Sequence, residues 1–200
     1  MQSSPRLLSA AKGFTLIEII IVVGIIAILS AIAIVSLNLP LRFQQARINE
    51  ATTDASALKV ATQLYFSDLG FYPPDVNRGV DPGFTQSLPS RPDGSSGDMG
   101  INCGHCPPDW QTVVAQKWRG PYLISWPMVT PWNGKYDYNY WGSGMIRYGC
   151  VVPSGIYAGV QGDYSNQNTI PEAAEQELID GGYDADGCLN GESELILIKF

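Results

Sequence analysis

Residues 12–18 of the chain have the sequence KGFTLIE, from Lys12 to Glu18, and an uncharged segment follows them directly. From Ile19 to Leu41 the sequence is IIIVVGIIAILSAIAIVSLNLPL. A helix crosses the hydrocarbon core of a bilayer with about 20 apolar residues, so this segment is long enough to span a membrane. A carboxylate at membrane depth costs about 2.5–3.5 kcal/mol on insertion scales. Glu18, just inside the start of the apolar helix, therefore needs a partner.

The motif at residues 12–18 resembles the processing site of type IV prepilins and of the pseudopilins of type II secretion systems. In that family a prepilin peptidase cleaves after the glycine, here Gly13, and methylates the new N-terminal residue, here Phe14. The resemblance also implies that Glu18 meets the terminal amine of a neighbouring subunit when a filament assembles. A buried carboxylate offset by a cationic amine is tolerated, whereas an unpaired one is strongly unfavourable.

Two simpler interpretations compete with this one. A secretory signal peptide would use Arg6 and Lys12 as its basic end and residues 31–33 (Ala-Ile-Ala) as its cleavage site. However, the apolar run continues to Leu39, and an acid such as Glu18 fits poorly in the apolar core of a signal peptide. A plain signal-anchor helix requires neither that acid nor the Gly-Phe junction. The pilin-type interpretation is therefore preferred.

Composition and charge agree with one membrane segment followed by one domain. The chain has 200 residues, of which 45% are hydrophobic, and a formal net charge of −7. An acidic chain without a basic cluster argues against nucleic-acid binding, except as cargo of a pilus. Arg6 and Lys12 would hold the N-terminal end in the cytoplasm, which places the residues after Leu41 outside it.

The expected organisation therefore has a leader, a helix and an extracytoplasmic domain. The leader would be removed by the peptidase, and the helix would serve first as a membrane span and later as the filament core. The domain would contain an amphipathic helix, a loop region, and a β-sheet with C-terminal loops. The boundaries are 1–13 for the leader, 14–41 for the membrane helix and 42–200 for the domain, subdivided into 42–69, 70–130 and 131–200.

Apolar residues recur every three to five positions after Pro40, with charged residues among them, which predicts an amphipathic helix over 42–69. Its expected core face is Phe43, Ala46, Ala51, Ala55, Leu58, Ala61, Leu64 and Tyr65. Gly70 and the prolines at 73 and 74 end the helix. Pro40 removes a helical hydrogen bond near the membrane exit, so we expect a kink or local opening there.

The resemblance extends into the domain. Residues 57–73 are similar to the helix end and "GxYP" turn of major pseudopilins, and residues 131–138 are similar to the stretch that opens their sheet, with Thr130 in place of the usual aspartate. A single long helix followed by strands predicts an α+β fold, with a small antiparallel sheet packed on the helix as in pilins. Further expected elements are helical patches at 109–118 and 172–179, and strands at 136–140, 146–152, 156–160 and 195–198.

The four cysteines lie on the side that is expected to be extracytoplasmic. An even number of cysteines in an oxidising compartment predicts disulfides, and four cysteines allow three pairings. We favour Cys103–Cys106 with Cys150–Cys188, the second closing a C-terminal loop of the sort that many type IV pilins carry. Major pseudopilins usually lack such a loop, so this feature favours pilins or an atypical branch.

The sequence Cys103-Gly104-His105-Cys106 also resembles the active dithiol of disulfide isomerases. A membrane-anchored thiol-disulfide oxidoreductase that uses Cys103 and Cys106 is thus the alternative function. That chemistry requires a helix that opens at the first cysteine, and two prolines follow Cys106 directly, so a structural disulfide is favoured. One CxxC pair with His105 and two scattered cysteines is a weak signal for zinc.

Asp184 and Asp186 resemble the start of a calcium loop, but the later acid is missing because position 195 is leucine. A solvated acidic turn is the preferred interpretation, and no cofactor is expected apart from this weak calcium candidate. His105 is the only histidine, so a Ser-His-Asp triad has little support. The sequence indicates a structural protein rather than an enzyme.

The resemblance also implies the partners and the location. The chain would polymerise with copies of itself and with minor pilins or pseudopilins. It would be processed by prepilin peptidase and extracted by an inner-membrane assembly platform with its ATPase. Before assembly it would lie in the inner membrane as a single-pass protein, and afterwards in a periplasmic pseudopilus or a cell-surface filament. The sequence leaves pilus and pseudopilus open.

Overall fold

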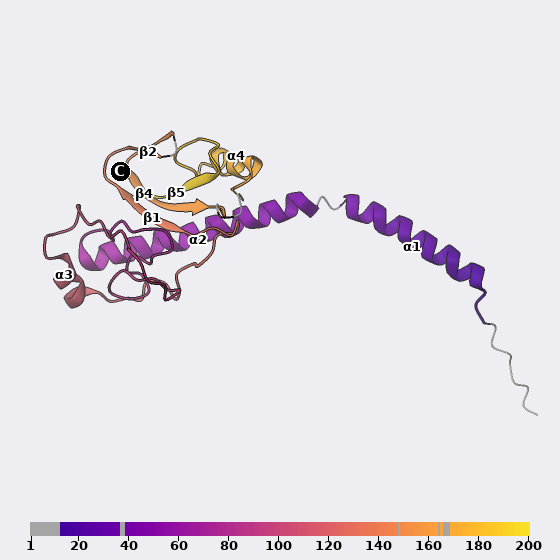
Figure 1. Ribbon diagram of the computed structural model, residues 1–200, viewed down its shortest axis with the longest axis horizontal. Coiled ribbons are helices and arrows are strands. Elements are labelled where there is room, and N and C mark those ends of the chain that lie inside the picture. Colours follow the sequence, from indigo (N-terminus) through magenta and orange to yellow (C-terminus); the bar gives the residue numbers. More distant parts are fainter. Residues whose placement is uncertain (1–12, 37–38, 148, 164, 166–168) are drawn as a thin grey trace, which may run out of the picture. The chain divides into compact units, whose positions relative to one another are not determined.

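The computed structural model of the chain describes residues 13–36, 39–147, 149–163, 165 and 169–200 (Figure 1). The chain divides into two units, residues 1–43 and 44–200, which are treated separately below. Residues 1–12, which make up nearly all of the expected leader, lie outside the described residues.

The first unit contains the apolar helix α1, which spans Leu16–Ser36. Its segment Leu16–Ile34 has 19 residues and a mean hydropathy of 3.0, and none of it is buried against other parts of the chain. It is long and apolar enough to cross a membrane, as expected. A helix that is apolar on every side has no polar face for water, so it suits lipid or a bundle of apolar helices better than water.

The next helix, α2, spans Leu39–Leu69. Pro40 lies in its first turn, where the backbone N–H that proline lacks would have no helical partner, so the residue fits there without breaking the helix. The join between α1 and α2, where a kink or opening is expected, falls at residues 37–38 and lies outside the described residues.

The core face of α2 is confirmed in part. Ala51, Ala55, Leu58, Ala61 and Tyr65 are buried as expected, and they are joined by Ile48, Thr62 and Leu69. The expectation is wrong for Phe43, Ala46 and Leu64, which are exposed. The buried set follows spacings of three and four residues, which keep one face of a helix in register, and Leu64 falls outside that stripe.

The end of α2 agrees with the sequence. Gly70 adopts a left-handed conformation with φ of 84°, and its N–H donates to the carbonyl of Phe66 at 2.8 Å. Glycine takes this conformation at little cost and thereby satisfies one of the carbonyls that the helix end leaves unpaired.

The sheet of the second unit has three antiparallel strands in the order β1-β4-β5. Tyr138 lies opposite Ala158 on the neighbouring strand, and Ala158 lies opposite Leu195 on the third. The strands expected around 136–140, 156–160 and 195–198 are therefore confirmed. The bounds are Asp137–Trp141 for β1, Gly155–Gln161 for β4 and Glu192–Lys199 for β5.

The single strand expected at 146–152 is wrong. The chain instead forms a hairpin of β2 (Met145–Arg147) and β3 (Cys150–Val152), in which Ile146 lies opposite Val151. Gly149 has a φ of 86°, a left-handed conformation that lets the chain reverse within a run of residues that otherwise favours strands.

Two short helices complete the second unit, α3 (Trp110–Lys117) and α4 (Glu172–Asp180), and both agree with the expected helical patches. The core joins the buried face of α2 to the sheet and to apolar residues of the loop region, such as Phe84. A small antiparallel sheet packed on a long N-terminal helix is an α+β, pilin-like arrangement, so the expected fold class is confirmed.

Candidate functional site

The expected cleavage point lies directly in front of α1. Residues 13–15 are not helical, and the helix begins at Leu16. The Phe14 side chain is 83% exposed. The Gly13–Phe14 bond thus lies in a non-helical, accessible stretch, which a peptidase can bind without first unwinding a helix.

Thr15 and Glu18 form reciprocal hydrogen bonds across the first turn of α1. The backbone N–H of Thr15 donates to Oε2 of Glu18 at 2.8 Å, and the Thr15 hydroxyl donates to the same oxygen at 2.7 Å. In return the backbone N–H of Glu18 lies 3.4 Å from Oγ1 of Thr15. This is a capping box, in which a Thr-x-x-Glu sequence satisfies backbone groups at a helix start. The Thr-x-x-Glu spacing lies within the processing motif, and the sequence analysis missed its local role.

The capping box fixes where the acid of α1 sits. It holds the Glu18 carboxylate at the N-terminal end of the helix, where the helix dipole favours a negative charge. Both bonds from Thr15 reach Oε2, and no described residue donates to Oε1. One oxygen is therefore engaged within the chain, and the other can accept a donor from outside it.

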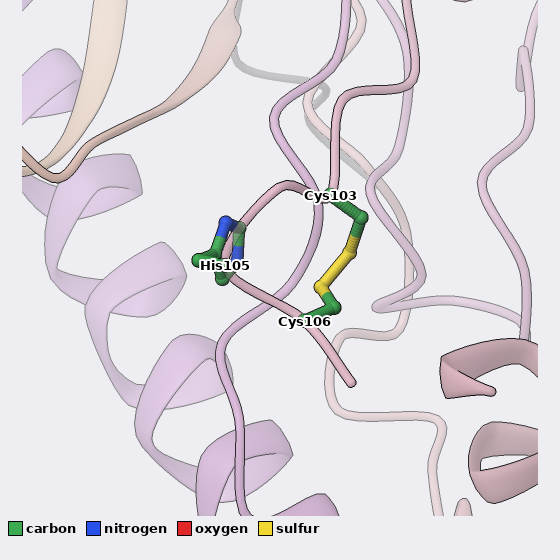
Figure 2. A group of neighbouring side chains, drawn as sticks. All are labelled: Cys103, His105 and Cys106. Carbon is green, nitrogen blue, oxygen red and sulfur yellow. A yellow bond between two sulfur atoms is a disulfide. The ribbon is translucent and has the colours of Figure 1, made fainter. Parts of the chain in front are cut away.

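The Cys103–Cys106 pair forms a disulfide in a turn, as the sequence analysis favoured (Figure 2). The N–H of Cys106 donates to the carbonyl of Cys103 at 2.9 Å, and the next helix, α3, begins only at Trp110. Catalytic dithiols gain reactivity from a helix N-terminus at the first cysteine. The first cysteine here lacks that helix, so the geometry does not favour the oxidoreductase alternative.

His105 lies between the two cysteines in sequence, but it makes its contacts elsewhere. Its Nε2 is 3.1 Å from the carbonyls of both Tyr72 and Pro73, and its ring stacks on Tyr140 with centroids 3.4 Å apart. Two carbonyl acceptors require the proton on Nε2, and burial lowers the pKa of His105, which favours the neutral ring. His105 therefore anchors the loop rather than activating a thiol.

Cys103, His105 and Cys106 also form a compact group of potential metal ligands, with one ligand atom of each within 4.8 Å of the others. In the described structure both sulfur atoms belong to a disulfide, and Nε2 of His105 donates to carbonyls. The group consequently offers no thiolate, and the zinc interpretation gains no support from it.

The second disulfide joins Cys150 of β3 to Cys188, in the loop before β5. This is the pairing that the resemblance favoured. The two cysteines are 38 positions apart in sequence, so the bond closes a long C-terminal loop that includes α4. Asn190 donates to Sγ of Cys150 at 3.4 Å and thereby packs the end of the loop on the bond.

Asp184 and Asp186 organise the same loop. Oδ1 of Asp184 accepts the N–H of Glu194 at 3.2 Å, and Oδ1 of Asp186 accepts the N–H of Cys188 at 2.9 Å. Asp184 is buried, so the expectation of a solvated acidic turn is wrong at that position, and burial raises the pKa of both acids. Neither aspartate belongs to a three-ligand cluster among the described residues.

The comparisons with known proteins agree with the N-terminal geometry. The family model of the prokaryotic N-terminal methylation motif matches residues 8–34. No curated protein and no solved structure gives a significant match. Proteins with this motif are generally structural rather than enzymatic. The chain therefore carries, at residues 8–34, the N-terminal signal of type IV pilins and pseudopilins.

Proposed function

We propose that the chain is a structural subunit of a type IV pilus-like filament or of a type II secretion pseudopilus. The observation that carries the proposal is an apolar helix, exposed on every side, with one carboxylate fixed at its N-terminal end. Such a helix is soluble in lipid, and it is equally soluble in a bundle of identical helices. The same surface can therefore serve a membrane-inserted precursor and a filament core.

Processing would follow the motif. With Arg6 and Lys12 on the cytoplasmic side, prepilin peptidase would remove residues 1–13 and methylate the new amine of Phe14. The helix at 14–41 would remain in the inner membrane, and the domain at 42–200 would lie outside the cytoplasm. The oxidised state of all four cysteines suits that side of the membrane.

Assembly would then pair charges between copies. The Phe14 amine of one subunit would meet the Glu18 carboxylate of another, and Oε1 of Glu18 offers an acceptor that the capping box leaves unused. Head-to-tail contacts of this type do not close on themselves, so they extend into an open helical filament. The chain would need a cytoplasmic ATPase and an assembly platform to supply the force, with minor pilins or pseudopilins as further partners.

The two branches of the proposal rest on different features. The long C-terminal loop closed by Cys150–Cys188 supports a surface pilus. The turn at residues 70–73 and the strand opening at 131–138 support a secretion pseudopilus. Both branches require the same processing and the same packing of α1 helices.

The test separates charge pairing from helix capping. Glutamine can replace glutamate in a capping box, but it carries no charge. We therefore expect Glu18→Gln to keep the helix start and still fail to form filaments, as we also expect of Glu18→Ala. Thr15→Val removes the hydroxyl bonds of the cap but keeps the backbone N–H at position 15 and the carboxylate, so it should retain more assembly than Glu18→Gln. Filaments sheared from the native host are quantified by sedimentation and electron microscopy.

Mass spectrometry of the same samples checks the processing step. The expected mature chain begins at methylated Phe14 in the wild type and in all three variants. Filament yield from Glu18→Gln equal to that of the wild type would limit the acid to capping and overturn the charge-pairing mechanism. A mature chain that begins at another residue would overturn the proposed route as a whole.

A further inference from the structure

The second unit contains a polar groove beside strand β1. A cavity of about 870 Å³ is lined by side chains of β1, of the segment 75–78 and of the hairpin that begins at Met145. A second hollow of about 340 Å³ continues it. The two hollows share Asn102, Tyr140, Gly142 and Ser143. They therefore form one open groove, and the larger hollow alone has the size of a small-molecule site.

Charged side chains in the wall of the groove largely neutralise one another. Arg78 lies 3.3 Å from the carboxylate of Glu192 and 3.9 Å from that of Asp137. Arg147 lies 3.6 Å from Asp137 and 3.9 Å from Glu194. Because these guanidinium groups already face carboxylates, the groove presents little net positive charge, and the chain as a whole is acidic. The electrostatics thus favour a neutral ligand over an anionic polymer.

Two buried atoms at the groove lack a hydrogen-bond partner among the described residues. One is an acceptor, Oδ1 of Asp137, and the other is a donor, Nε of Arg91. Both residues line the larger hollow. A buried polar atom without a partner costs about 1–3 kcal/mol, so a ligand that pairs with both atoms gains that energy back. A hydroxyl group can donate to a carboxylate and accept from a guanidinium, and a polyhydroxylated ligand can do both at once.

An aromatic surface borders the groove. Tyr140 lines both hollows, with His105 stacked on it and Phe200 at a ring-centroid distance of 5.4 Å. Tyr72 contacts both Tyr140 and Phe200, and Phe200 is about half exposed. Pyranose rings have apolar C–H faces that pack on aromatic rings, while their hydroxyls reach polar neighbours. The partly exposed aromatic rings can pack on the C–H face of a sugar ring, and the polar atoms without a partner can bond to its hydroxyls.

We infer that this groove binds a neutral saccharide chain. The hydroxyls pair with Oδ1 of Asp137 and Nε of Arg91, and a sugar ring packs against the aromatic surface at Tyr140. The inference goes beyond filament formation and does not rest on it, because every groove residue lies in the unit 44–200. A failure of assembly and a failure of saccharide binding are thus separate results.

The experiment uses the detergent-solubilised full chain and isothermal titration calorimetry. The probes are cellohexaose, maltohexaose and the hexamer of N-acetylglucosamine, with heparin as an anionic comparison. Saturable binding of at least one neutral hexasaccharide is expected. Arg91→Gln and Tyr140→Leu should each weaken it about tenfold or more, because a charge-assisted hydrogen bond or a ring contact is lost. Arg119→Gln and Tyr183→Leu are matched controls outside the groove and should bind as the wild type does.

Each result decides the inference once thermal melts show that the variants are folded. Loss of binding in the two groove variants, with binding intact in the two controls, supports it. No binding of any neutral probe overturns it. Equal binding by Arg91→Gln, Tyr140→Leu and the wild type overturns the location. Tighter binding of heparin than of every neutral probe overturns the ligand class.

Discussion

The two units of this chain place their apolar side chains in opposite environments. Leu29 in α1 is 61% exposed, whereas Leu58 in α2 is 1% exposed. The described part of α1 is not buried, while the second unit builds its own core from α2, the sheet, the loops and residues of α3 and α4. Leucine in the second unit therefore stabilises an internal fold, whereas leucine in α1 would stabilise an external association on the proposed route.

The largest expected effect comes from one substitution made in both units. Leu58→Ala should lower the free energy of unfolding of residues 44–200 by about 2–5 kcal/mol, because it leaves a cavity in a packed core. Leu29→Ala should leave that unfolding free energy unchanged, since its side chain contacts no core. Urea titration in detergent, followed by tryptophan fluorescence, measures both. Equal losses in the two variants would contradict the division into two units.

The disulfides are the next test, because both lie in the second unit but close loops of different length. Chain-entropy reasoning gives about 4 kcal/mol for Cys150–Cys188, whose partners are 38 positions apart, and about 2 kcal/mol for Cys103–Cys106, whose partners are 3 apart. The variant with serine at both Cys150 and Cys188 should accordingly lose more stability in denaturant titrations than the variant with serine at both Cys103 and Cys106. A larger loss from the shorter loop would show that local packing outweighs loop closure.

Buried charge should make the second unit sensitive to pH. Burial raises the pKa of Asp137 from 3.8 to about 7; the negative charges of Asp75 and Glu192 add to the rise, and Arg147 and Arg78 oppose it only in part. The folded state then binds a proton more readily than the unfolded state does, so this contribution to stability is full below pH 3.8 and is lost as the pH rises through about 7. The fall should be smaller in Asp137→Asn, which imitates the protonated form. Thermal melts at a series of pH values measure it, and an identical fall in both proteins would contradict the assignment.

The smallest effects should differ in sign between the units. Neither Gly24 nor Gly70 has a heavy atom within 4 Å of a Cβ added to it, so alanine fits sterically at both positions. Gly24→Ala should raise the helix content of α1, because glycine is about 1 kcal/mol worse than alanine inside a helix. Gly70→Ala should destabilise the second unit by about 1 kcal/mol, since φ there is 84°. Circular dichroism in micelles and denaturant titrations measure the two changes.

The features that could be predicted from the sequence are those that depend on residues close together in the chain. The apolar helix, the processing motif and the end of α2 at Gly70 depend on neighbouring residues, and all three were predictable. The reversal at Gly149 was missed because a strand-forming run hid a single glycine. The capping box is visible in the sequence as Thr15-x-x-Glu18, but the same residues also belong to the processing motif, so the motif alone does not reveal it.

The groove was not predictable by any local pattern. Arg91 and Asp137 come from distant parts of the sequence, and only the tertiary fold brings them to one surface. The sequence predicts a strand at 136–140, and Tyr136 and Tyr138 are buried on one face of it. In fact Asp137 and Asn139, on the other face, are buried as well. Polar residues that are buried by loops carry no periodic signal in sequence.

The reciprocal bonds between Thr15 and Glu18 have a consequence for the lifetime of an idle subunit. An acid that already has a donor on its own chain can be stored in the bilayer without waiting for a second copy. On the proposed route, incorporation into a filament adds the Phe14 amine of another subunit to a Glu18 carboxylate that already accepts hydrogen bonds. Disassembly then returns each monomer to lipid with its interim partner in place, so the pool of monomers can be reused.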